Sequence, residues 1–396
     1  MIKRHTRNGL MAIAGAATLL ALTACVPNGS TASDSSGSTR VTVDSSATEC
    51  AVSAKTAPSG PVSFSVTNSA DKVTEFYLLG EDGLRIVGEI ENVTPGVKRN
   101  LTVRLQPGKY FTECKPGMTG TGVGRAPFTV TDSGKSIKLT GDITSQTQLA
   151  AKNYVAYVQS QVAQLVPATD AFLAAYRAGN DDQARALYAT TRAYYERIEP
   201  VAESFGHLDP KIDFREADVP EGEEWTGFHR IEKDLWPPAD AAYVPLTGKQ
   251  RTYYSDKLTS DIAELSDEVN AKNYSVSIDA ISNGAIGLLD EVASGKITGE
   301  EEIWSHTDLW DFQANLEGAR VAYEGVRDIV RGKNASLVKS IDARFEELEK
   351  QLAGYGSLDA GFTYYDKLTP AQVKALANGV NALSEPLSRL TAALVK

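Results

Sequence analysis

Hydrophobic and polar residues alternate along the first third of the chain, over residues 41–140. A period of two is typical of strands with one buried face, and Pro-Gly, Asp-Gly and Pro-Ser-Gly turn signals separate the runs. About seven short strands of this kind predict a Greek-key β-sandwich. The clearest runs are Val62, Phe64 and Val66; Leu101, Val103 and Leu105; and Phe128 and Val130.

From about Ser145 to the end, hydrophobic residues recur every three to four positions, which is the period of amphipathic helices. One stripe runs from Tyr154 to Leu165 and a second from Leu187 to Ile198. The chain is therefore predicted to be multidomain, with an all-α bundle of long antiparallel helices at 141–396 behind the sandwich. Later helical patterns span residues 250–272, 274–294, 308–331, 334–353 and 370–394.

The N-terminus has the features of an export signal over residues 1–24, with three basic residues before an apolar run. Leu-Thr-Ala-Cys25 resembles a bacterial lipobox, which predicts a lipid on Cys25. A plain secretory signal or an uncleaved helix is the alternative, although the apolar run is short for a bilayer span. The small polar residues at 25–40 predict a flexible tether. We expect an exported lipoprotein, anchored in the membrane and facing the periplasm or the extracytoplasmic surface.

The charge of the chain argues for a cation as its partner. The 396 residues carry a formal net charge of −11, and removal of the three basic residues in the signal leaves −14. Such an acidic surface repels nucleic acids and attracts cations. We therefore expect no nucleic-acid partner.

Two cysteines, Cys50 and Cys114, remain beyond the signal, and in an oxidising compartment they are expected to form a disulfide. However, Cys114 is followed four residues later by Met118, a spacing that resembles the ligand loop of cupredoxins over residues 41–140. A blue-copper site also needs two histidines, and these residues contain none. The alternative to a disulfide is therefore a site for copper or a second iron, with Met118 and a carboxylate. The candidate carboxylates are Glu75, Glu89 and Glu113.

His229 and Glu232, in the segment Gly-Phe-His229-Arg-Ile-Glu232, form the central motif of the helical region. Three residues apart on a helix, they share one face and can hold one ion between them. An imidazole with carboxylates suits iron, zinc or manganese. The alternative is an ordinary surface pair.

Glu196, Glu199 and Glu203 precede this motif and are predicted to line one helical face. Three carboxylates on one face repel each other unless a cation neutralises them. Helical bundles build metal sites from carboxylates on one helix and a His/Glu pair on another. A solvated acidic stripe is the alternative.

Two aspartates are lesser candidates for ligands. Asp213 ends the segment Asp-Pro-Lys-Ile-Asp213, and Asp308 follows a Ser-His-Thr sequence. His306 and Asp308 are alternatively capping and packing residues, with Ser305 or Thr307 capping the next helix.

Three segments together resemble the imelysin-like family: residues 195–206, 227–232 and 305–312. With the cupredoxin-like region in front, the resemblance covers the mature chain. It implies a component of an iron-uptake system that binds Fe²⁺ or Fe³⁺ and works with a membrane iron permease and a haem peroxidase-like protein.

The same family includes proteins described as peptidases, which implies a zinc metallopeptidase that uses His229 and Glu232 as the alternative. The sequence has no His-Glu-x-x-His motif and no Ser/His/Asp or Cys/His arrangement, so an enzyme is the weaker hypothesis. A metal-free surface protein that binds polymers is the third hypothesis.

Overall fold

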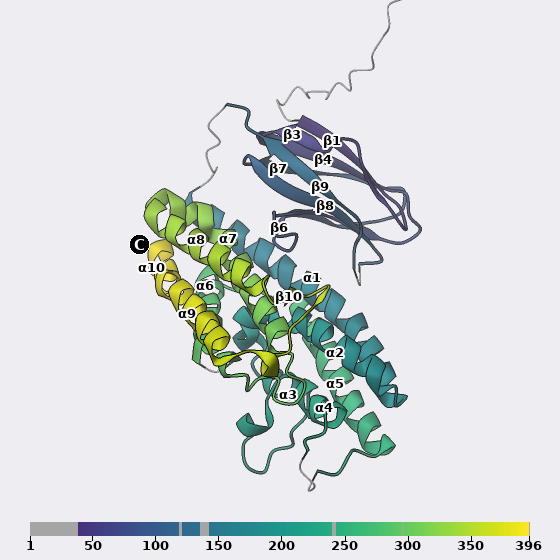
Figure 1. Ribbon diagram of the computed structural model, residues 1–396. Coiled ribbons are helices and arrows are strands. Elements are labelled where there is room, and N and C mark those ends of the chain that lie inside the picture. Colours follow the sequence, from purple (N-terminus) through teal and green to yellow (C-terminus); the bar gives the residue numbers. More distant parts are fainter. Residues whose placement is uncertain (1–38, 119–120, 135–141, 240–242, 295, 396) are drawn as a thin grey trace, which may run out of the picture.

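The protein has a β domain followed by a helical domain (Figure 1). The computed structural model describes residues 39–118, 121–134, 142–239, 243–294 and 296–395. The predicted signal at 1–24 and Cys25 lie outside the described residues. So does the predicted tether at 25–40, except for its last two residues, which open the first strand.

The β domain is a sandwich of two open sheets, as the alternating pattern predicted. Its core contains a cluster of three aromatic rings, in which Phe64 lies 5.3 Å from both Phe76 and Phe128 between ring centroids. The four-stranded sheet has the order β2 (Cys50–Val52), β1 (Thr39–Ser45), β4 (Gly60–Asn68) and β7 (Lys98–Leu105). The five-stranded sheet has the order β3 (Thr56–Pro58), β9 (Val123–Thr131), β8 (Gly108–Pro116), β5 (Thr74–Leu79) and β6 (Ile86–Val93).

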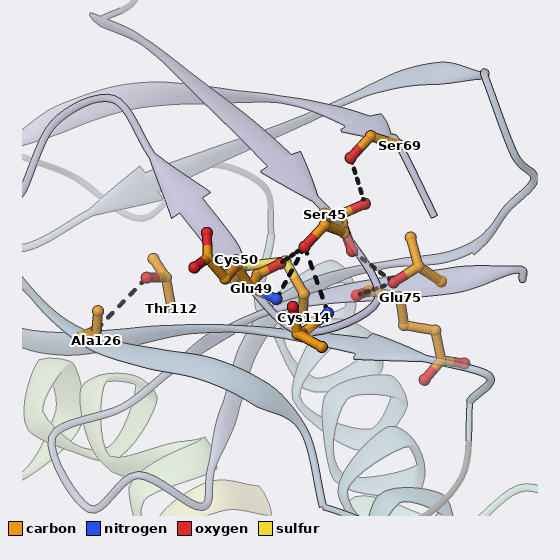
Figure 2. Close-up of a disulfide and its surroundings, with 11 residues drawn as sticks. Ser45, Glu49, Cys50, Ser69, Glu75, Thr112, Cys114 and Ala126 are labelled. Atoms are coloured by element: carbon orange, nitrogen blue, oxygen red, sulfur yellow. Dashed lines mark hydrogen bonds between the residues drawn. A yellow bond between two sulfur atoms is a disulfide. The ribbon is translucent and has the colours of Figure 1, made fainter. Parts of the chain in front are cut away.

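A disulfide between Cys50 of β2 and Cys114 of β8 joins the two sheets (Figure 2). Their Cα atoms lie 5.4 Å apart, and both residues belong to the buried core of the sandwich. The disulfide prediction is therefore confirmed. Because both sulfur atoms are used in this bond, neither is available as a thiolate ligand for copper or for a second iron.

The structure also separates the other proposed ligands of the β domain from this disulfide. Lys115 and Glu113 flank Cys114 on β8, so their side chains lie on the opposite face of the sheet, which packs on the helical domain. Glu75 pairs with Lys115 across the strands, and Tyr77 pairs with Glu113 and with Glu89. A single ion cannot reach both faces, so the predicted set of cysteine, methionine and glutamate ligands is wrong for this sheet.

The polar residues on that face bond one another or the helical domain. The Tyr77 hydroxyl donates to Glu75, Arg125 donates to Glu113, and the Lys115 ammonium donates to Ser160 at 3.1 Å. Met118 lies two residues after the end of β8, in the left-handed backbone region, with φ 64°.

The helical domain is a bundle of long helices, in agreement with the periodicity of the sequence (Figure 1). The first helix runs along the β domain, where Asn153 donates to the Val87 carbonyl and Tyr77 joins the helical core. The helices of the bundle are α1 (Ile143–Arg177), α2 (Asp181–Glu196), α4 (Phe228–Leu235), α5 (Gly248–Val269), α6 (Ile278–Ser294), α7 (Asp308–Lys333), α8 (Ala335–Leu352), α9 (Pro370–Leu387) and α10 (Leu390–Val395). Short elements between them are η1 (Glu199–Phe205), α3 (Asp209–Ile212), η2 (Glu216–Asp218), η3 (Lys296–Thr298), η4 (Tyr365–Lys367) and the hairpin strands β10 (Gly356–Ser357) and β11 (Gly361–Phe362).

The expected single acidic face through Glu196, Glu199 and Glu203 is wrong. The α2 helix ends at Glu196, and the other two glutamates lie in the 3₁₀ segment η1. Pro200 explains the break, because a proline disfavours the α conformation of the residue before it and lacks a donor for the helical ladder. The side chain of Glu203 is outside the described part of the structure.

Within the described residues, none of the helices combines the length and the apolar composition needed to cross a bilayer.

Reduction of the Cys50–Cys114 disulfide should destabilise the β domain. The bond closes a loop with a sequence separation of 64, so its loss is expected to cost about 4 kcal/mol through the entropy of the unfolded chain. Guanidinium unfolding with and without reductant measures this change, with Cys50→Ala/Cys114→Ala as the matched variant. An unfolding midpoint that reductant leaves unchanged would contradict the prediction.

Candidate metal centre

Gly227 sets the position of the helix that carries the histidine. It is the residue before α4 and has φ 87°, a backbone conformation that favours glycine. A Cβ atom there would lie 2.3 Å from the Ile212 carbonyl oxygen, so only glycine lets α4 begin against the end of α3. This close approach places His229, in the first turn of α4, beside Asp213.

His229 and Glu232 share a helical face as predicted, and neither side chain is exposed to solvent. The alternative of a surface pair is therefore wrong. The imidazole Nδ1 lies 3.2 Å from Glu232 Oε2 and 3.9 Å from Glu302 Oε1. Its Nε2 lies 3.7 Å from both Asp213 Oδ1 and Glu301 Oε1, yet has no hydrogen-bond partner. Each ring nitrogen thus faces two carboxylates.

A loop in front of α7 supplies Glu301 and Glu302. Glu232 holds this loop, because its Oε1 accepts the backbone N–H groups of Trp304 at 3.1 Å and Ser305 at 2.7 Å. The Ser305 hydroxyl in turn donates to Glu302 Oε2 at 2.7 Å. Glu232 therefore both faces the imidazole and positions the second pair of acids.

Arg192 of α2 is fully buried in the middle of these acids. Its guanidinium lies 2.5 Å from Glu196 and 2.6 Å from Glu302, contacts Asp213, and lies 3.6 Å from Asp311. Burial alone lowers the pKa of a guanidinium, but the surrounding carboxylates outweigh this effect and raise the pKa of Arg192 well above its usual value. Arg192 is therefore a permanent internal cation.

Lys296 of η3 is the second buried cation, with only 4% of its side chain exposed. Its ammonium lies 3.1 Å from Glu196, 3.0 Å from Glu199 and 3.6 Å from Glu301. Burial opposes its charge, but these carboxylates raise the pKa of Lys296 well above the usual value. Glu196 and Glu199 thus converge on one cation although they do not share a helix.

Asn315 of α7 holds the same two carboxylates from the other side. Its Nδ2 donates to Glu196 Oε2 at 2.9 Å and to Glu199 Oε2 at 2.7 Å. Gly318, one turn later, allows this approach, because a Cβ atom there would lie 2.4 Å from the Arg197 carbonyl oxygen. The packing of α7 on the end of α2 thus fixes the orientation of both glutamates.

Carboxylates outnumber the cations in this region of the described structure. Burial raises the pKa of Glu302, Glu199 and Asp311 well above the usual range and raises that of Asp308 to about 7. Burial therefore disfavours the charged forms of these acids, because too few positive charges offset it. The eight carboxylates of the centre are Glu196, Glu199, Asp213, Glu232, Glu301, Glu302, Asp308 and Asp311.

The imidazole responds to the same environment. Burial and the nearby Arg192 lower the pKa of His229, but the hydrogen bond with Glu232 and the neighbouring carboxylates Glu301 and Asp213 outweigh them and raise it to about 9. His229 therefore carries a proton between acids in the metal-free protein. A multivalent cation can replace this proton, since it satisfies several carboxylates at once.

An aromatic shell surrounds the buried charges. The Arg192 guanidinium lies 5.7 Å from the Phe228 ring centroid and 6.0 Å from that of Tyr188. The Tyr188 hydroxyl donates to Glu302 Oε1 at 3.2 Å. Because such a shell excludes water, the electrostatic interactions inside it are stronger than at the surface.

Asp308 lies at the edge of the centre, where its Oδ1 accepts the backbone N–H of Glu302 at 3.2 Å. Thr307 is the residue before α7, but its side chain makes no capping bond, and Ser305 bonds Glu302 instead. The predicted capping role of these two hydroxyls is therefore wrong. His306 accepts the Tyr365 N–H through its backbone carbonyl.

Sequence reasoning missed several members of this centre. Glu301 and Glu302 belong to a run of three acids shortly before the Trp-Ser-His segment, and this run could have been recognised from the sequence. Arg192 lies four residues before Glu196, so their pairing on α2 was also predictable. Nothing in the sequence pointed to Lys296, since it arrives from a distant 3₁₀ turn.

A second group of potential ligands lies on the surface. The His207 Nε2 is 3.3 Å from Glu264 and 3.2 Å from Glu268, and all three side chains are substantially exposed. Exposed pairs of this kind contribute little to stability and are common without an ion. His207 provides a control histidine for the buried centre.

Comparison with known proteins identifies close relatives. The Peptidase_M75 family model, described as imelysin, matches residues 150–390. A protein of Escherichia coli O157:H7 named "Iron uptake system component EfeO" is 38% identical over 353 residues, which cover 87% of this chain and 89% of the relative. Proteins of the same name from Escherichia coli K12 and Shigella flexneri are 37% identical over the same shares.

Replacement of Arg192 should strongly destabilise the metal-free protein. Arg192→Met leaves several buried carboxylates without their counter-charge, which is expected to cost about 3–5 kcal/mol. Lowering the pH from about 8 to about 5 should reduce this loss, because the uncompensated carboxylates take up protons. Urea unfolding in the presence of a chelator measures both effects.

The matched control is Arg344→Met, which removes an exposed pair with Glu347 and is expected to cost less than about 1 kcal/mol. Equal losses in the two variants would mean that the cluster around Arg192 contributes no special stability.

Proposed function

This chain belongs to the imelysin family and to its EfeO-type iron-uptake components, and from that premise we propose that it captures iron at the His229 centre. The bound ion is the cargo of the protein. We further propose that the protein carries a lipid anchor and passes the ion to a membrane iron permease, with a haem peroxidase-like protein as another partner of the system.

The observation that carries this proposal is the unpartnered Nε2 of His229. This nitrogen is fully buried, lies 3.7 Å from Asp213 and Glu301, and makes no hydrogen bond. A buried polar atom without a partner is costly, and an ion between the nitrogen and the two carboxylates removes that cost. One imidazole with several carboxylates is a donor set that suits Fe²⁺ and Fe³⁺.

Glu232 and Glu302 complete the proposed ligand set on the Nδ1 side of the ring. His229, Glu232 and Glu302 each offer an atom within 4.8 Å of the others, as do Asp213, His229 and Glu301. We assign Glu196 and Glu199 to the neighbouring carboxylate group around Lys296, and Asp308 to the support of Glu302. Glu203 remains a candidate from the sequence alone.

Zinc-dependent peptide cleavage is the competing function, and the geometry favours it less. A catalytic zinc keeps an open position for water and substrate, whereas His229 and Glu232 are both without solvent exposure. Burial of this kind suits the retention of an ion. The β domain, which its disulfide ties together, then serves as an adaptor between the membrane and the helical domain.

The His229 centre can be tested with a double substitution. His229→Ala/Glu232→Ala removes two proposed ligands and is expected to abolish stoichiometric iron binding, because loss of even an outer-shell partner costs about 10–100-fold in metal affinity. Anaerobic titration with Fe²⁺ and aerobic titration with ferric citrate, each followed by elemental analysis, measure the bound iron. His207→Ala, which alters only the exposed histidine, should bind as the wild type does.

Iron binding that survives the double substitution would exclude this site. Metal-dependent cleavage of a peptide library by the wild type, lost in His229→Ala/Glu232→Ala, would favour the peptidase function instead.

The lipid anchor is tested at Cys25. Cys25→Ser removes the atom that the lipid would occupy, so the protein should move from the membrane fraction to the soluble extracytoplasmic fraction, with iron binding unchanged. Fractionation followed by immunoblotting measures this shift. A variant that stays in the membrane fraction would indicate an uncleaved N-terminal helix.

A further inference from the structure

Glu301 lies among three positively charged groups of the centre. Its Oε1 lies 3.7 Å from His229 Nε2 and 3.6 Å from the Lys296 ammonium. The same oxygen lies 3.8 Å from the Arg192 guanidinium. Glu301 thus belongs to the proposed iron site on one side and to the carboxylates around Lys296 on the other.

The Lys296 ammonium has surroundings that resemble those of a bound metal ion. Three carboxylates from three different elements converge on it: Glu196 from α2, Glu199 from η1 and Glu301 from the loop before α7. Both Oε atoms of Glu199 lie 3.0 Å from the nitrogen, as in a bidentate contact. Only 4% of the Lys296 side chain is exposed.

We propose that Glu196, Glu199 and Glu301 form a second cation subsite beside His229, in which Lys296 takes the place of a metal ion. The inference rests on the proposed function of the His229 centre and extends it. Glu301 bridges the two positions, in the way that carboxylates bridge paired metal ions in the cores of helical bundles. The second subsite takes a multivalent cation that prefers oxygen ligands.

The neighbouring groups fit such an ion. Asn315 already orients Glu196 and Glu199 through its Nδ2, and its own Oδ1 is buried without a partner in the described structure. Three carboxylates suit hard cations such as Mn²⁺ and Fe³⁺.

Lys296 then has two roles. In the metal-free protein its charge keeps Glu196 and Glu199 from repelling each other, so the centre stays folded without an ion. When an ion approaches the second subsite, it must displace the ammonium, and this competition weakens its binding. A carrier that must give up its cargo benefits from an internal competitor of this kind.

The test compares Lys296→Leu with Lys296→Arg. Leucine removes the charge and leaves space for an ion, whereas arginine keeps a cation in place. We use Mn²⁺ as the probe, because two Mn²⁺ ions that share a carboxylate give an exchange-coupled electron paramagnetic resonance spectrum. Equilibrium dialysis gives the number of ions per chain.

Lys296→Leu should bind one more Mn²⁺ per chain than Lys296→Arg and should show the coupled spectrum. The added substitution Glu199→Gln should remove this extra ion. The wild type should take up the extra ion at least about tenfold more weakly than Lys296→Leu. Equal numbers of ions in the leucine and arginine variants, or an uncoupled spectrum from two ions, would overturn the inference.

If Lys296→Leu does not fold, Mn²⁺ binding to the wild type still tests the inference. Its second, weaker Mn²⁺ should disappear in Glu199→Gln, and a wild type without a second ion would then overturn the inference. Failure of the proposed function looks different. In that case the wild type and His229→Ala/Glu232→Ala bind the same number of ions. Lys296→Leu then binds one ion if the second subsite exists and no ion if it does not.

Discussion

The neutralisation of buried carboxylates is the constraint on which the helical domain depends. Acids from α2, η1, the end of α3, α4 and α7 meet in the buried interior, where uncompensated charges repel strongly. Arg192 and Lys296 hold this group together, and each of them contacts acids from more than one element. The bundle is therefore organised around buried carboxylates whose negative charge is neutralised by internal cations. An added metal ion would neutralise more of the same charge.

Local backbone features bring these acids together. Pro200 ends the helical region after Glu196 and turns Glu199 toward Lys296. Gly227 allows α4 to start against α3, which brings His229 beside its acids. Pro200 and Gly227 each interrupt regular secondary structure, and the contacts within the centre compensate for this loss. Local departures from ideal geometry thus mark the candidate metal centre in this chain.

The two domains use different means of stabilisation. The sandwich has its own aromatic core and a disulfide between its sheets, so its cysteines serve structure. The face of the sheet that packs on α1 contains charged residues paired within the interface, among them Lys115. This arrangement separates the β domain from the buried acids of the helical domain, and it leaves His229 as the candidate ligand for iron.

The sequence by itself determined the order of the two domains, the helical spans and the His229–Glu232 pair, because these depend on local periodicity and on residues one turn apart. It also indicated the disulfide, since two cysteines in a chain that is expected to be exported have few alternatives. Only the tertiary structure decided which acids meet at the imidazole, because Glu301 comes from a loop about seventy residues further along the chain. The buried position of Lys296 was likewise beyond prediction, since a lysine becomes an internal cation only when distant elements enclose it.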